Sequence, residues 1–128
     1  LLAWELGHLS ASSVVSVALC YDTSLVHEPG FGYLVPQRER EPILGCIFDS
    51  LVFPKQPMQR GGSRLTVMLG GSHHPGMCHL SAEQCVEIAR EALRRHLKIT
   101  QAPVAHLVTV AQQAIPQYFV GHNAFVQK

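Results

Sequence analysis

Short runs of apolar residues, separated by polar loops, dominate the chain, and the run at residues 64–71 is the most distinctive. Its sequence, RLTVMLGG, is almost continuously apolar and ends at two glycines, which is typical of a strand covered on both faces. Alternation divides the run into two faces, with Leu65, Val67 and Leu69 on one and Thr66 and Met68 on the other. The first face is expected to join the core. The second offers a hydroxyl group and a flexible thioether, which suit a pocket for a flat apolar ligand, although a methionine in a buried strand is more often core.

Alternating and β-branched segments predict four further strands. Residues 12–22, SSVVSVALCYD, are rich in β-branched side chains and keep their larger apolar side chains on one face. Residues 31–36 and 43–48 flank a polar loop, and each contains an internal glycine. Such a glycine weakens a strand and usually marks a bulge or the close approach of a ligand or another backbone. Residues 104–111 are the last predicted strand, and residues 1–9 have the pattern of the final turns of a helix.

The clearest helix is predicted over residues 81–98. Ser81 and Gln84 have the spacing of a capping box, and Glu83 lies in the first turn, where a carboxylate complements the helix dipole. The apolar stripe of this helix consists of Ala82, Cys85, Val86, Ala89, Ala92, Leu93 and Leu97. The order of elements therefore predicts an α+β fold, with an antiparallel or mixed β-sheet and one clear amphipathic helix.

Composition limits the classes of protein to which the chain can belong. At 128 residues with 47% hydrophobic residues, it is expected to form one domain with a substantial core. Only 15% of the residues are charged, so we expect part of the surface to be covered by something else. A net charge of +1 gives no electrostatic footprint for nucleic acid. The chain starts without methionine, so we expect it to be a piece of a longer protein, and its four cysteines without a Cys-x-x-Cys pair favour a reducing compartment.

One group of potential metal ligands stands out, which we call the histidine cluster: His73, His74, Cys78 and His79. Adjacent histidines on an extended segment point apart, and no second group of ligands completes a zinc-finger spacing, so we interpret the cluster as a polar loop and predict no metal site. The chain also has no Gly-x-Ser-x-Gly elbow, no paired carboxylates and no Gly-x-Gly-x-x-Gly fingerprint. No catalytic residue is assigned.

Four glycine-punctuated motifs remain, and their order is more specific than any one of them. They are GFGYLVP at residues 30–36, LGCIFDS at 44–50, VMLGG at 67–71 and IPQYFVGH at 115–122. In this order and spacing they resemble the C-terminal part of the eukaryotic protoporphyrinogen oxidase family, flavoproteins of the amine-oxidase superfamily. The sequence departs from that family at residues 123–125, which read NAF where the family usually has a tryptophan, and at His73 and His74, where it has an aromatic residue.

The resemblance implies a place in a larger enzyme. The strands would form the substrate-binding region of a two-domain FAD oxidase, and residues 1–128 would be a partial domain without the segments that bind the FAD dinucleotide. The residues that would line the tetrapyrrole pocket are Phe31, Gly32, Leu34, Ile47 and Met68. Glycines let a planar macrocycle approach the backbone closely, and the larger side chains supply apolar surface for it. Gly121 and His122 would approach the flavin.

The activity implied by the resemblance is the oxidation of protoporphyrinogen IX to protoporphyrin IX in haem synthesis, with FAD as cofactor and dioxygen as the final oxidant. The flavin would carry the chemistry, and the protein would orient the substrate. The resemblance also implies a peripheral enzyme on the intermembrane-space side of the mitochondrial inner membrane, and it leaves a homodimer open. Alone, the chain is expected to be inactive. Two alternatives remain: a non-catalytic β-rich binding module, and an amine-oxidase relative that acts on another substrate.

Overall fold

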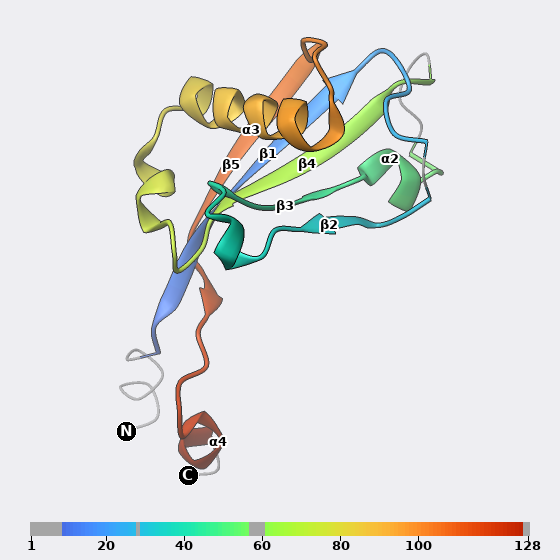
Figure 1. Cartoon of the computed structure of the whole chain (residues 1–128). Coiled ribbons are helices and arrows are strands. Elements are labelled where there is room, and N and C mark those ends of the chain that lie inside the picture. The colour runs from blue at the N-terminus through green and yellow to red at the C-terminus, as the bar shows by residue number, and fades with distance from the viewer. Residues whose placement is uncertain (1–8, 28, 57–60, 127–128) are drawn as a thin grey trace.

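The computed structural model describes residues 9–27, 29–56 and 61–126, and these contain a five-stranded sheet in which every neighbouring pair is antiparallel (Figure 1). The strand order is β2-β3-β4-β1-β5. The strands are β1 (Ala11–Tyr21), β2 (Gly32–Leu34), β3 (Ile43–Ile47), β4 (Ser63–Gly70) and β5 (Ala105–Pro116). Every predicted strand is present, and β4, which contains the distinctive apolar run, is the central one. The predicted α+β fold class is confirmed, and the sheet is antiparallel rather than mixed.

The predicted helix is α3 (Ala82–Leu97), and its ends follow the sequence signals. The hydroxyl oxygen of Ser81 accepts a hydrogen bond from the amide of Gln84, and the side chain of Gln84 accepts one from the amide of Ser81, so the capping box is complete. The remaining helical pieces are short: η1 (Gln37–Glu39), α2 (Asp49–Val52), η3 (Pro75–His79) and α4 (His122–Val126). Residues 49–53, expected to be irregular, contain the single turn of α2.

Helix α3 lies across one face of the sheet and closes the core (Figure 1). The side chains buried between helix and sheet are Val15, Val17, Leu19 and Tyr21 of β1, Ile43 and Cys46 of β3, Leu65, Val67 and Leu69 of β4, and Cys85, Val86, Ala89, Ala92 and Leu93 of α3. The predicted core face of β4 is therefore confirmed. The cause is strict alternation along β1 and β4, whose registered pairs set Leu19 beside Leu65 and Val17 beside Val67.

The opposite face of the sheet, which we call the open face, has no helix across it in the described part of the chain. Thr66 and Met68 of β4 and Ser16 of β1 are only half-buried there. Cover on both faces of β4 was expected, and among the described residues it is present on the α3 face alone. The open face therefore presents side chains of a central strand to whatever approaches it.

Strand β5 is longer than predicted. Its pairing with β1 shifts register near Ser12 and Val14, and at this point Gln113 takes a positive φ of 47° while its amide donates to the hydroxyl of Ser13 at 2.9 Å. Between the pairs Ser12–Ile115 and Val14–Ala111, β5 has two more residues than β1, and this bulge lets the strand continue to Pro116. Beyond it the chain runs to α4, away from β2 and β3 (Figure 1). The helix expected over residues 1–9 falls outside the described residues apart from Leu9, which is not helical.

Candidate functional site: the open face of the sheet

Strand register arranges the open face in two rows that run across the sheet. The first row is Leu34, Gly45, Met68, Ser16 and Thr109. The second row is Gly32, Ile47, Thr66, Ala18 and Leu107. Each row places small residues between larger apolar ones, so the face combines flat stretches with apolar side chains that project from it.

Four of the five residues predicted to bind substrate lie together in these rows. Leu34 is 84% exposed, Ile47 and Met68 are half-buried, and Gly32 lies opposite Ile47. Leu34 and Met68 flank Gly45, which is paired with both of them. The predicted pocket residues thus form one continuous surface, and their role in binding stays a prediction.

Phe31, the fifth of these residues, precedes β2 and is less closely tied to the rows. Its carbonyl oxygen accepts a hydrogen bond from the amide of Phe48 at 2.9 Å, which extends the pairing of β2 and β3 by one residue. Its side chain is 65% exposed. Phe31 therefore adjoins Gly32 at the end of the β2–β3 pair, with its ring largely exposed.

Two glycines of this face are required by the sheet itself. A Cβ atom on Gly45 would lie 2.3 Å from the carbonyl oxygen of Tyr33, and one on Gly32 would lie 2.1 Å from the carbonyl oxygen of Cys46. Gly32 also has a φ of 149°, which residues with a side chain rarely adopt. Of the explanations that the sequence offered for these glycines, the structure supplies the close approach of a neighbouring backbone at both positions and a register shift of β3 on β4 just before Gly45. A ligand would meet a surface already flat for that reason.

A polar margin borders the apolar part of the open face, and sequence reasoning missed it. The hydroxyl of Thr66 donates to a carboxylate oxygen of Asp49 at 2.7 Å, which joins α2 to the central strand. Arg64 comes two positions before Thr66 in β4, and alternation puts it on the same face. The guanidinium of Arg64 donates to the side-chain oxygen of Gln56 at 3.2 Å. The alternation of β4 could have identified Arg64 from the sequence.

Gly121 and His122, the predicted flavin-side residues, lie apart from the rows. They stand at the start of α4, at the far end of the molecule from β2 and β3 (Figure 1). The ring of His122 stacks on that of Tyr118 with centroids 4.5 Å apart. The structure therefore does not bring these two residues together with the predicted substrate residues, and their approach to a flavin remains a prediction.

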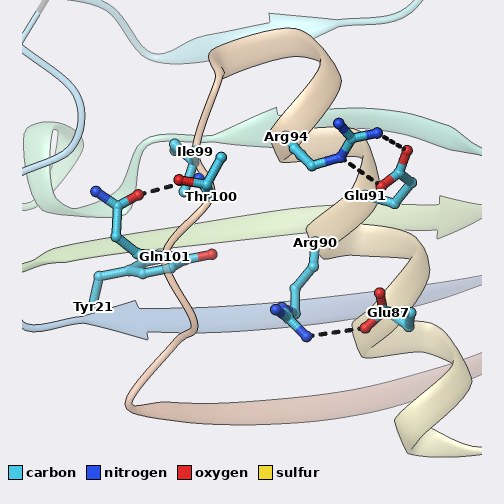
Figure 2. A pocket seen from close by; sticks show the side chains of 8 residues that line it. All are labelled: Tyr21, Glu87, Arg90, Glu91, Arg94, Ile99, Thr100 and Gln101. Atoms are coloured by element: carbon cyan, nitrogen blue, oxygen red, sulfur yellow. Dashed lines mark hydrogen bonds and ion pairs between the residues drawn. The ribbon is translucent and has the colours of Figure 1, made fainter.

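A hollow lies on the α3 side of the molecule, between the helix and the loop that follows it. Figure 2 shows that Arg90 turns toward Glu87 and Arg94 toward Glu91, with nitrogen–oxygen distances of 3.0 and 2.7 Å. Hydrogen bonds from Arg94 lower the pKa of Glu91 to about 2. The charges that line this hollow are thus already paired with one another, as on a solvated helix face, and they offer little to a charged ligand.

The described residues provide no activated nucleophile and no metal cluster. Burial raises the pKa of the Cys46 thiol to about 12, so it stays protonated at neutral pH and is a poor nucleophile. In the histidine cluster, Nδ1 of His73 lies 3.1 Å from the side-chain nitrogen Nε2 of Gln37, and the two form a hydrogen bond. Among the described residues, no three side chains of the metal-ligating types come together. Within the same residues, no helix is both long and apolar enough to cross a bilayer.

Comparison with known proteins identifies the family. The sequence model for flavin containing amine oxidoreductases matches residues 3–128. The chain belongs to this family. Its relatives include the protoporphyrinogen oxidases of Bos taurus and Homo sapiens, which are 40% and 39% identical over 125 residues, 94% of the chain. The protoporphyrinogen oxidase of Schizosaccharomyces pombe is 37% identical and matches 88% of the chain.

This family member spans only about a quarter of the length of those relatives, with 26% of the bovine and human proteins and 24% of the yeast protein matched. A solved structure, that of a candidate protoporphyrinogen oxidase from Exiguobacterium sp. 255-15, superposes with a TM-score of 0.77 at 23% identity. The match covers 96% of this chain and 27% of the Exiguobacterium chain. The likeness confirms the fold of the open-faced sheet with its single long helix.

The family name implies a flavin, and the described residues do not fit the dinucleotide form of that cofactor. Such a cofactor needs a glycine-rich turn that leads from a strand into a helix, whose free amides hold the pyrophosphate. The only long helix among the described residues, α3, follows η3 rather than a strand. The hydroxyl of Ser81 already accepts from one of its first amides. A flavin in dinucleotide form would therefore have to be held by residues other than those described.

Proposed function

We propose that the chain forms part of the substrate-binding region of an oxygen-dependent protoporphyrinogen oxidase. The reaction would convert protoporphyrinogen IX to protoporphyrin IX, with FAD as cofactor and dioxygen as final oxidant. One observation carries the proposal: mammalian and yeast relatives named protoporphyrinogen oxidase are 37–40% identical to this chain over 88–94% of its length. The domain is proposed to be partial, completed by the rest of the same enzyme.

The open face suits a flat, largely apolar macrocycle. Ser16 and Ala18 are small residues of this face, and Leu34, whose side chain lies over the buried Gly45, and Met68 supply apolar side chains beside them. The spacing of residues along a strand places Arg64 roughly 13 Å from Met68. Ionised propionate groups at the edge of a tetrapyrrole would therefore meet the polar margin while the ring rests on the apolar rows. Arg64 has no carboxylate partner among the ion pairs of the described residues.

The role of this chain in the reaction is binding and orientation. Its carboxylates near the face are engaged, since Asp49 accepts from Thr66, and its buried thiol Cys46 stays protonated. The oxidation itself belongs to the flavin held elsewhere in the enzyme. Following the sequence resemblance, we further propose peripheral association with the intermembrane-space side of the mitochondrial inner membrane, and a homodimer is compatible with the proposal.

The test uses a full-length protein that contains this chain. Flavin absorbance of the purified protein and porphyrin fluorescence on addition of protoporphyrinogen IX are measured side by side. We expect a yellow protein that produces protoporphyrin and consumes dioxygen. A flavoprotein that leaves protoporphyrinogen unchanged but oxidises an amine would favour the relative with another substrate.

The chain expressed alone serves as the control. We expect residues 1–128 to bind no flavin and to produce no porphyrin, because the described residues have no pyrophosphate cradle. Its open face would also leave Leu34 and Leu107 in water, which favours aggregation. A yellow and active preparation of the chain alone would contradict the proposal that it is one part of a larger enzyme.

A further inference from the structure

Strand β2 contributes residues to the open face although it is an edge strand. It has only three residues and lies at the edge of the sheet, with β3 as its single neighbour, yet it carries both Gly32 and Leu34. Short edge segments with few hydrogen bonds open more readily than central strands. The position of Leu34 therefore depends on whatever else anchors β2.

The anchor is the side chain of Tyr33, which turns to the opposite face, toward α3. Its hydroxyl oxygen lies 3.0 Å from Nδ1 of His96 in the last turn of the helix. The two rings also meet edge-on, with centroids 5.5 Å apart and an angle of 71° between their planes. Nε2 of His96 lies 3.5 Å from a carboxylate oxygen of Glu41, just before β3, and the other oxygen of Glu41 accepts from Arg95. Helix, edge strand and loop are thus joined by one chain of polar side chains.

The protonation states on either side of His96 are fixed by their surroundings. Burial raises the pKa of Tyr33 well above its usual value, so the phenol keeps its proton and can donate. A hydrogen bond from Arg95 lowers the pKa of Glu41, so that carboxylate is ionised at neutral pH. With the imidazole proton on Nε2, Nδ1 accepts from the hydroxyl of Tyr33 while Nε2–H faces the carboxylate of Glu41 at 3.5 Å.

We propose that the linked side chains of Tyr33, His96 and Glu41 form a positioning device that holds β2 against α3 and thereby sets the place of Leu34 on the open face. Tyr33 and Leu34 are neighbours in a three-residue strand, so a shift of one moves the other. None of the three linked residues touches the ligand surface, so each acts through Leu34. The inference rests on the function proposed above, because it assigns to these residues an effect on the affinity for protoporphyrinogen.

The first measurement is steady-state kinetics of the full-length enzyme with three variants. Tyr33→Phe removes the hydroxyl alone, and His96→Phe removes both ring nitrogens while keeping an aromatic ring beside Tyr33. Glu87→Gln is the matched control, since it breaks an ion pair with Arg90 on the same helix that does not reach β2. We expect KM for protoporphyrinogen IX to rise about 2- to 10-fold in the first two variants, the range set by one lost hydrogen bond. We expect kcat to change little, and neither constant to change in the control.

The second measurement is independent of turnover: hydrogen exchange of the backbone segment 31–35, in which the Val35 amide donates to the carbonyl oxygen of Leu44 at 2.9 Å. Exchange should accelerate in Tyr33→Phe and His96→Phe and stay unchanged in Glu87→Gln. Unchanged exchange in the first two variants would overturn the anchor. Faster exchange with an unchanged KM would overturn its link to the ligand surface. Faster exchange in a protein that does not oxidise protoporphyrinogen at all would support the anchor and refute the proposed function instead.

Discussion

The two faces of β4 predict opposite outcomes for substitutions only three positions apart. Leu65 is 1% exposed and points into the core beside Leu19, beneath α3. Leu65→Ala removes the equivalent of three methylene groups, or about 2.4 kcal/mol of transfer free energy at about 0.8 kcal/mol each. The cavity left behind adds to this, and core Leu→Ala changes cost about 2–5 kcal/mol in total. Because β4 is hydrogen-bonded to strands on both sides, the site cannot collapse easily, and we expect about 3 kcal/mol or more.

Hydrogen exchange of the β4 amides in the full-length protein measures this loss locally. Exchange is preferable to a global unfolding curve, since a large cofactor-binding protein need not unfold in two states. A loss of about 3 kcal/mol corresponds to exchange more than ~100-fold faster. Met68→Ala is the control on the open face, and it should change exchange only a few-fold while weakening the binding of protoporphyrinogen. Equal acceleration in Leu65→Ala and Met68→Ala would refute the assignment of the two faces.

Four further changes test other parts of the structure. Met68→Lys in the full-length enzyme should abolish turnover while flavin absorbance is retained, because an unpaired charge would lie against an apolar macrocycle; unchanged kinetics would contradict this. Gly45→Ala should destabilise the pairing of β2 and β3, since its Cβ would lie 2.3 Å from a backbone oxygen, whereas Gly76→Ala, with nothing within 4 Å, should melt like the parent protein. Micromolar zinc should leave the melting temperature unchanged, and a rise of many degrees would reveal a metal site in the histidine cluster. Finally, the hydrogen bond from Arg95 lowers the pKa of Glu41 below its usual 4.5, so its contribution to stability is present above that pH and is lost as pH falls. The acid unfolding curves of the parent and of Glu41→Gln should therefore converge at low pH, and a constant offset would argue against this linkage.

The elements with strong local signals could be predicted from the sequence. Alternation along β4 identified its core face, although cover was expected on both faces, and the Ser81–Gln84 capping box fixed the start of α3. The end of β5 could not be predicted in this way. Its continuation past residue 111 depends on a bulge at Gln113, which is stabilised by the hydroxyl of Ser13, a hundred positions away. The local sequence around Gln113 does not predict such a distant partner.

The same limit applies to the candidate site. The motifs identified Leu34 and Met68 as surface for a ligand, but their placement on either side of Gly45 is a property of strand register. Register is set by pairing across the sheet, which the sequence encodes only through the whole set of buried residues. The contact between Tyr33 and His96 joins residues 63 positions apart, so no local pattern predicts it.

The glycines of the open face connect the fold to the proposed function more closely than the sequence suggested. Gly32 and Gly45 first appeared suited to the approach of a planar ligand, yet each is already required by the carbonyl oxygen of a neighbouring strand. The close packing of β2 on β3 therefore accounts for both glycines before any ligand is present. A macrocycle on the open face would gain apolar contact from Leu34, whose side chain lies over Gly45, and from Met68. Selection for tight strand pairing and selection for a flat binding surface would then act on the same two positions, so substitution of either glycine should damage both the sheet and the site.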